Sequence, residues 1–246
     1  MPQDQQYVSN ELFHFVGRNQ QPKRQFELLV QIMQSRVLLS SKCAGTNYDL
    51  DGDGRLLAGE MMNVPAICFC DIPVESLSIH IKKYGPFSLS FSKRFVSNNG
   101  GKPVIYVPLK SMASIGQGSR GSDLPQKLRT VIQSLRELEK IRSNADYNES
   151  INDRQTRRLV SKTIAQGQFL TKEFYYFIKL FDEDLPLEHR KNYYMEREWR
   201  IVNNPIQPQL QFSISNIKHI IVPGEFRGQI LRMFPNVESK LINAPK

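Results

Sequence analysis

Apolar and polar residues follow two kinds of spacing along this chain, and the two together predict a mixture of strands and helices. Alternation and short apolar runs predict strands at residues 12–16, 66–70, 87–91, 103–107, 198–203 and 218–222. Helical spacing predicts helices at residues 24–36 and 225–234. Asp71 suits a helix N-cap and Pro73 the first turn, which predicts a further helix ending near Tyr84.

The middle of the chain has a different pattern. Residues 116–122 are rich in Gly and Ser and predict a flexible joint. Residues 123–182 then look helical, with a polar break at 144–152 and a second helix near 153–165. One apolar face of the first helix consists of Leu128, Val131, Ile132, Leu135, Leu138 and Ile141. The aromatic-rich residues 169–181 are expected to pack on the core.

These elements predict one α+β domain over residues 1–246, with a mixed, largely antiparallel sheet. Its core would be formed by residues 1–115 and 190–246, and the helical block 120–185 would be inserted into it or packed against it. A chain of 246 residues that is 40% hydrophobic can bury one sizeable core.

Composition excludes several classes of protein. No apolar run approaches the ~20 residues that cross a bilayer, so no membrane partner is expected, and the polar N-terminus does not resemble a secretory signal. Three cysteines form no disulfide framework or metal knuckle, which favours a reducing, cytoplasmic location. The motifs of phosphate-binding loops, zinc proteases and serine hydrolases are absent.

The net charge is +9, and its distribution is uneven. Residues 76–122 contain no Asp or Glu but seven basic residues: Lys82, Lys83, Lys93, Arg94, Lys102, Lys110 and Arg120. Such a stretch favours a polyanion, either a nucleic acid or a pyrophosphate-bearing cofactor. The alternative is a basic face that only contacts solvent.

Glu196 and Glu198 are the first candidates for chemistry. Two carboxylates spaced i, i+2 at the entrance of a strand are expected to point the same way, so one could act as a base while the other stabilises positive charge. The only tryptophan, Trp199, follows directly. The alternative is an exposed acidic pair that nearby arginines balance.

Two further candidates are single residues. His14 alternates with Phe13 and Phe15, so it faces a cleft or solvent if the phenyl rings face the core. Tyr84 lies at a helix-to-strand corner, where its ring could cover a ligand. For His14 the alternative is an ordinary hydrogen-bonded histidine, and for Tyr84 it is a core aromatic.

Residues 49–60 match the calcium loop of EF-hands, with acids at Asp49, Asp51, Asp53 and Glu60 and a glycine at position six. Carboxylates on a tight loop are the ligands that Ca²⁺ prefers. No clear helix enters the loop, however, and Pro65 shortens any exit helix. A solvated acidic loop without metal is therefore the main expectation.

Several short motifs, taken in order, resemble the bacterial abortive-infection family typified by AbiGi, which guards against phage. They are Leu12–Phe15, Cys68–Pro73, His80–Gly85, Phe91–Lys93, Pro103–Tyr106 and Glu198–Arg200. The resemblance spans most of the chain outside the helical block, and the Phe-Cys-Asp-Ile-Pro and Glu-Trp-Arg motifs are its most specific parts. The calcium-like loop is not part of it.

The same layout is similar, more distantly, to ADP-ribosyltransferases. That resemblance implies NAD as cofactor, an ADP-ribosyltransferase-like sheet, Glu198 as the carboxylate that stabilises the oxocarbenium-like transition state and Glu196 as a base toward the acceptor. Tyr84 would stack near the nicotinamide and complete the catalytic set. The other implied cofactor contacts are His14, Phe13, Lys93 and Trp199.

The sequence thus leads to two hypotheses. The first is an NAD-dependent ADP-ribosyltransferase that acts as a toxin-like effector in phage defence and modifies, for example, nucleic acid. The second is a non-catalytic antitoxin or regulatory partner in a phage-defence pair, since AbiGi is itself described as an antitoxin. A calcium-regulated binder is a third, weaker alternative.

Overall fold

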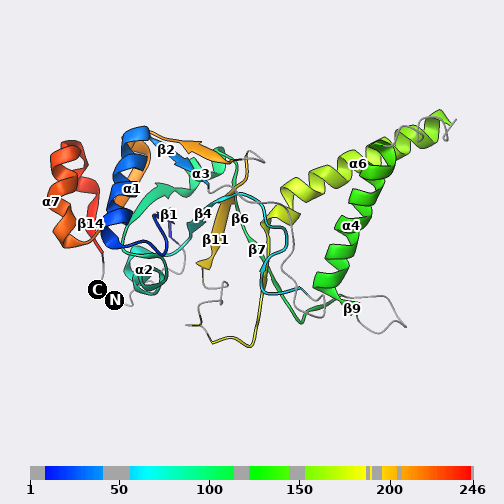
Figure 1. Cartoon of the computed structure of the whole chain (residues 1–246), viewed down its shortest axis with the longest axis horizontal. Coiled ribbons are helices and arrows are strands. Elements are labelled where there is room, and N and C mark those ends of the chain that lie inside the picture. Colours follow the sequence, from blue (N-terminus) through cyan, green and yellow to red (C-terminus); the bar gives the residue numbers. More distant parts are fainter. Residues whose placement is uncertain are drawn as a thin grey trace, which may run out of the picture. The chain divides into compact units, whose positions relative to one another are not determined.

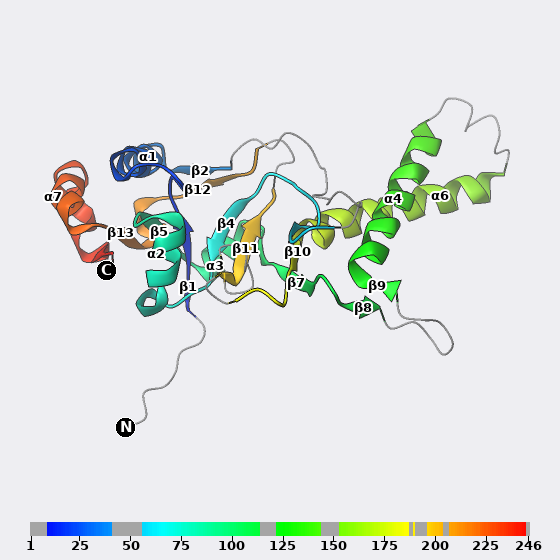
Figure 2. The same ribbon diagram turned by 60° about the horizontal axis from the view of Figure 1, so that its bottom comes forward.

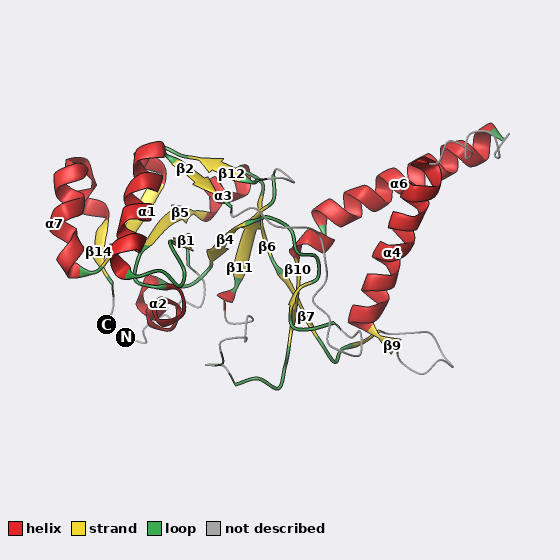
Figure 3. Ribbon diagram, viewed as in Figure 1, coloured by secondary structure: helices red, strands yellow, loops and turns green. Residues whose placement is uncertain are grey.

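The computed structural model describes residues 9–40, 56–113, 122–143, 153–186, 189, 196–203 and 207–244. The chain divides into two compact units. The first comprises residues 1–44, 64–104 and 187–246, and the second comprises residues 45–63 and 105–186. Both mix strands with helices (Figures 1 and 3).

The first unit is built on a seven-stranded sheet in the order β14-β13-β5-β1-β4-β11-β6. Its pairs are antiparallel except β13 with β14, which confirms the predicted α+β class with a largely antiparallel sheet. The strands are β1 (Glu11–Phe15), β4 (Ile67–Cys70), β5 (Ser88–Ser92), β6 (Gly101–Pro103), β11 (Glu198–Ile201), β13 (Ile217–Val222) and β14 (Leu241–Asn243). A separate pair joins β2 (Val37–Leu39) to β12 (Gln209–Gln211).

The two faces of this sheet bury different clusters. Helices α1 (Pro22–Ser35) and α7 (Gly224–Met233) cover the larger one, which includes Leu12, Phe69 and Phe91. Helix α2 (Ser78–Tyr84) lies on the opposite face (Figure 2), over a smaller cluster formed by Phe13, Cys70 and Ile221. Because strand side chains alternate between faces, neighbours in sequence such as Leu12 and Phe13 belong to different clusters.

Helix boundaries in this unit follow local chemistry. Pro22 begins α1, where its missing N–H costs nothing, and Arg36 ends the helix in the left-handed conformation. The 3-10 turn η1 (Val74–Ser76) precedes α2, so the helix predicted from Asp71 begins later than expected. Helix α3 (Lys93–Asn98), which the sequence did not predict, is capped by Ser92. The remaining elements are 3-10 turns η4 (Ile214–Asn216) and η5 (Pro235–Lys240).

The second unit contains a three-stranded sheet in the order β3-β10-β7, formed by β3 (Gly59–Glu60), β10 (Ile178–Phe181) and β7 (Ile105–Pro108). A two-stranded ladder joins β8 (Met112–Ala113) to β9 (Ser122–Asp123). Two long helices, α4 (Leu124–Ser143) and α6 (Arg154–Glu173), lie where the helical block was predicted, and the 3-10 turn η2 (Tyr175–Phe177) follows α6. Among the described residues, no helix is both long and apolar enough to cross a bilayer.

Candidate functional site

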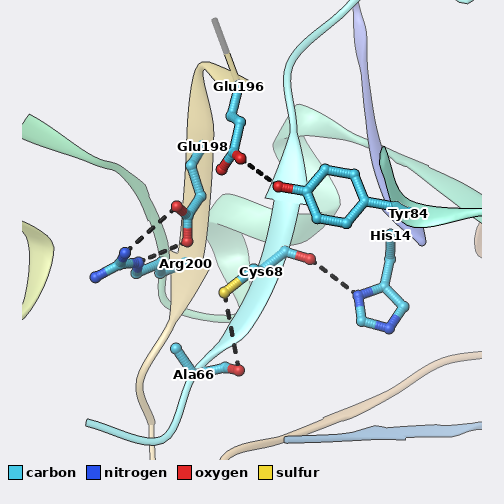
Figure 4. Close-up of polar contacts among 7 residues, drawn as sticks. All are labelled: His14, Ala66, Cys68, Tyr84, Glu196, Glu198 and Arg200. Atoms are coloured by element: carbon cyan, nitrogen blue, oxygen red, sulfur yellow. Dashed lines mark hydrogen bonds and ion pairs between the residues drawn. The ribbon is translucent and has the colours of Figure 1, made fainter. Parts of the chain in front are cut away.

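Strand β11 carries Glu198 and Arg200 on one face, where both side chains are almost completely buried. Arg200 donates from Nε to Glu198 Oε1 at 2.7 Å and from Nη2 to Oε2 at 3.3 Å. The carboxylate predicted to be catalytic is therefore held by a two-point ion pair with its own strand (Figure 4). Such a pair is favoured because either charge alone would be costly to bury.

Glu196 has different partners. Its Oε1 accepts from Lys83 Nζ at 2.6 Å and from the hydroxyl of Tyr84, both at the end of α2. Glu196 lies just before β11, and the rule that residues i and i+2 point the same way applies only to an extended backbone. Arg197 between them adopts φ 43°, in the left-handed region, and Figure 4 shows the two carboxylates directed to separate partners.

Tyr84 lies in an aromatic and cationic setting. Its ring centroid is 5.5 Å from that of Phe15 and 6.3 Å from that of His80, and the Arg18 guanidinium lies 4.9 Å above it. Burial, and then the charge of Glu196, raise the pKa of Tyr84 far above its usual range. Tyr84 is therefore a neutral hydroxyl that donates to Glu196, rather than a base.

His80 is buried within the same cluster. Burial lowers its pKa to about 4, against the attraction of Glu196, and Lys83 lowers it further. Its Nδ1 atom has no hydrogen-bond partner among the residues that the structure describes. His80 is thus a neutral ring at pH 7 that packs against both Phe15 and Tyr84.

His14 lies on the other face of the sheet from Glu198. Phe13, Cys70 and Glu198 form one cross-strand row, so alternation directs His14 to the side of the larger cluster. Its Nδ1 atom lies 2.9 Å from the carbonyl oxygen of Cys68, and its ring packs against Phe69. Burial lowers its pKa, which the hydrogen bond to Cys68 partly offsets. Phe13 and Phe15 cover the α2 side of the sheet, so His14 points away from both rings and is hydrogen-bonded to the backbone of β4.

The remaining cofactor candidates are dispersed. Phe13 is buried under α2, whereas Trp199 packs against the larger cluster on the opposite face. Lys93 Nζ lies 2.7 Å from Asp71 Oδ2. The structure therefore brings Glu196, Tyr84 and Lys83 into direct contact. It places His14 and Trp199 on the face away from Glu198 and Tyr84.

The acid-free basic stretch loses much of its charge in the folded chain. Lys83, Lys93 and Lys110 form ion pairs with Glu196, Asp71 and Asp184, acids that lie outside residues 76–122. The stretch is also divided between the two units at residue 104. A run of like charge in sequence is therefore partly neutralised by acids from other parts of the chain.

The calcium-like loop falls mostly outside the described residues, which include none of Asp49, Asp51 and Asp53. Glu60 is described, and its backbone in β3 pairs with that of Lys179 in β10. In an EF-hand this last acidic position lies beside an exit helix, but here residues 61–66 contain none. Within the described ranges, no three His, Cys, Asp or Glu side chains converge as a metal site.

Two sets of polar contacts in the first unit were not predicted from the sequence. Arg18 lies over Tyr84, although no pattern in the turn after β1 indicates it. Glu11 Oε2 accepts from Ser90 Oγ at 2.5 Å and lies 2.8 Å from His219 Nδ1, while the His219 amide donates to Ser90 Oγ. These residues come from three neighbouring strands, so only their register could reveal the network.

Comparison with known proteins agrees with the resemblance that the motifs suggested. A family model described as "Putative abortive phage resistance protein AbiGi, antitoxin" matches residues 41–221. A relative from Lactococcus lactis subsp. cremoris, named abortive phage resistance protein AbiGi, is 27% identical over 165 residues. The match covers 64% of this chain and 58% of the relative, so the chain spans little more than half of that protein. No solved structure matches the chain. Since the family model covers well over half of the sequence, this chain belongs to the AbiGi family of abortive phage resistance proteins.

Proposed function

We propose that this chain acts in abortive phage resistance as a non-catalytic, antitoxin-type partner of a toxic protein. The observation behind this proposal is that both candidate catalytic carboxylates are hydrogen-bonded to other side chains inside the fold. Glu198 is paired with Arg200, and Glu196 is held by Lys83 and Tyr84. The description of the matching family as an antitoxin supports the same interpretation, and the name of the relative supports a role in phage resistance.

Two growth experiments test this function. Expression of the chain alone in a bacterium without the rest of the system should leave growth unchanged. Depletion of the chain in its native host should slow growth, because the toxic partner would be released, and a plasmid-borne copy should restore it. Growth arrest by the chain alone would contradict the proposal, as would depletion without any effect on growth or phage resistance.

An NAD-dependent ADP-ribosyltransferase, acting as the toxin half, is the second candidate. The observation that favours it is the contact of Glu196 with Tyr84 and Lys83, which places a carboxylate, a phenol and a cation together. The purified chain, incubated with labelled NAD and DNA, RNA or protein, would then transfer label. Transfer should be lost in Glu198→Gln, whereas Glu27→Gln, which changes an exposed ion pair, should retain it. Absence of transfer to every acceptor would exclude this candidate.

A further inference from the structure

The positive charge of the folded chain is concentrated on the two long helices of the second unit. Helices α4 and α6 together carry ten basic and three acidic residues, a net +7, whereas the whole chain is +9. The basic residues of this helix pair are Lys127, Arg129, Arg136, Lys140, Arg142, Arg154, Arg157, Arg158, Lys162 and Lys172.

The two helices pack against each other through the middle of α4 and the second half of α6. Ile132 and Ile164 are buried there, and Gly167 lies so close to Leu135 that an added Cβ atom would clash with it at 2.4 Å. Figures 1 and 2 show the first part of α6 extending beyond this contact. No side chain in residues 154–162 is buried, so packing contributes little to holding this segment in place.

Four cations gather on that extended segment. Arg154, Arg158 and Lys162 recur every four residues and form one stripe about 12 Å long. Arg157 lies beside the stripe, and all four line one open depression. Within the described part of the chain, none of the four takes part in a side-chain ion pair. Asp153, which directly precedes the stripe, uses its carboxylate to cap the helix and also interacts electrostatically with Arg157.

We propose that residues 154–162 of α6 form a binding site for a nucleic-acid backbone. A stripe of cations about 12 Å long spans several phosphates of a strand, whose axial repeat in a duplex is about 3.4 Å. Three of the four cations are arginines, whose planar guanidinium groups can donate two hydrogen bonds to one phosphate.

Apolar side chains are scarce on the segment. Leu159 is 64% exposed, but no aromatic residue occurs within 154–162, whereas the core of a protein interface is rich in aromatic and apolar residues. The charges therefore favour phosphates over an acidic protein. This site goes beyond the proposed antitoxin-type function, and it can be tested without a toxin.

Fluorescence anisotropy of the full chain tests the site, with labelled single-stranded RNA, single-stranded DNA of the same sequence and duplex DNA as probes. Binding should weaken from about 50 mM to about 200 mM KCl, with a log–log slope near −3 for single strands if four phosphates are contacted. Charge reversal at Arg154→Glu, Arg158→Glu and Lys162→Glu should weaken binding at least about tenfold and lower the slope by about 2.

The matched control reverses three exposed cations of the first unit, Lys23→Glu, Lys218→Glu and Arg232→Glu. It should change binding by less than about threefold, because those residues lie outside the stripe. Circular dichroism should show equal helix content in both triple variants. Equal losses in both variants would overturn the proposal, as would no binding to any probe at low salt. Displacement of the nucleic acid by polyglutamate at equal charge would instead indicate an acidic protein ligand and would also overturn it.

Discussion

Glu198 and Arg200 form an ion pair that is almost completely removed from solvent. Arg200→Met would leave Glu198 buried without this partner, so we expect the free energy of unfolding to fall by about 3–5 kcal/mol. Combining Glu198→Gln with Arg200→Met should recover part of that loss, because the double variant no longer buries the negative charge of Glu198. Denaturant unfolding followed by Trp199, the only tryptophan, reports on this strand.

The matched control for that experiment is Arg24→Met, since the Arg24–Glu27 pair is about half exposed. This substitution should lower the free energy of unfolding by less than about 1 kcal/mol. Similar losses in the two single variants would refute the role of burial.

The Glu198–Arg200 pair also decides which variant to use in the labelled-NAD assay. A Glu198→Ala protein could lose transfer merely because Arg200 is left without its partner carboxylate. The isosteric Glu198→Gln is therefore the better variant.

The buried His80 leads to a prediction about how the stability of the protein depends on pH. Its pKa is about 4 in the folded chain, against the ordinary histidine value of 6.5, so between these values the unfolded chain binds the additional proton. The free energy of unfolding should therefore fall as pH drops from about 6.5 to about 4, by up to about 3 kcal/mol from this residue. His80→Gln should show a smaller fall over that window in denaturant titrations. Identical pH profiles for the two proteins would contradict the shift.

The end of α2 depends on a contact between two helices. Gly85 follows α2 with φ 96° and ψ 165°, a conformation that is nearly exclusive to glycine. The Gln25 side chain from α1 packs against it and donates to the carbonyl oxygens of Gly17 and Tyr84. An added Cβ atom would lie 2.1 Å from Gln25 Nε2. This contact fixes the position of Tyr84, and thus of the group that holds Glu196.

Gly85→Ala should therefore lower the free energy of unfolding by about 1–3 kcal/mol from backbone strain, with displacement of Gln25 adding to the loss. Gly228→Ala is the control, because Gly228 lies inside α7 with nothing within 4 Å of the added Cβ. Helix propensity predicts a gain of up to about 1 kcal/mol there. Thermal melts of both variants check the pair. A Gly85→Ala protein as stable as the wild type would refute the strain.

One predicted strand belongs to two sheets. The apolar run 103–107 predicts a single strand, but β6 ends at Pro103 and pairs with β11, whereas β7 begins at Ile105 and pairs with β10. Val104 between them donates its amide to the carbonyl of Glu198. Local pattern predicts a strand but not its neighbours, because pairing is decided by segments far away in sequence.

The distribution of charge also differs between the sequence and the folded chain. The acid-free stretch 76–122 is the obvious basic region in sequence, yet folding supplies Glu196, Asp71 and Asp184 to three of its lysines. The α4–α6 pair contains acids in sequence and does not stand out there, yet it carries most of the net charge. A count of charges along the sequence and the charges of the folded chain therefore point to different regions as the most basic one.

The sequence alone determined the α+β class, most strands of the large sheet, both long helices and the family. These depend on local periodicity and on short motifs such as Glu198–Arg200, which are visible without a fold. Only the tertiary structure decided how the candidate residues are grouped. Strand register placed His14 on the other face of the sheet from Glu198. Lys83 of α2 contacts Glu196, whereas Arg200 of the same strand pairs with Glu198. The Lys83–Glu196 contact and the pairing of β4 with β11 join residues more than a hundred positions apart, for which a single sequence carries no local signal.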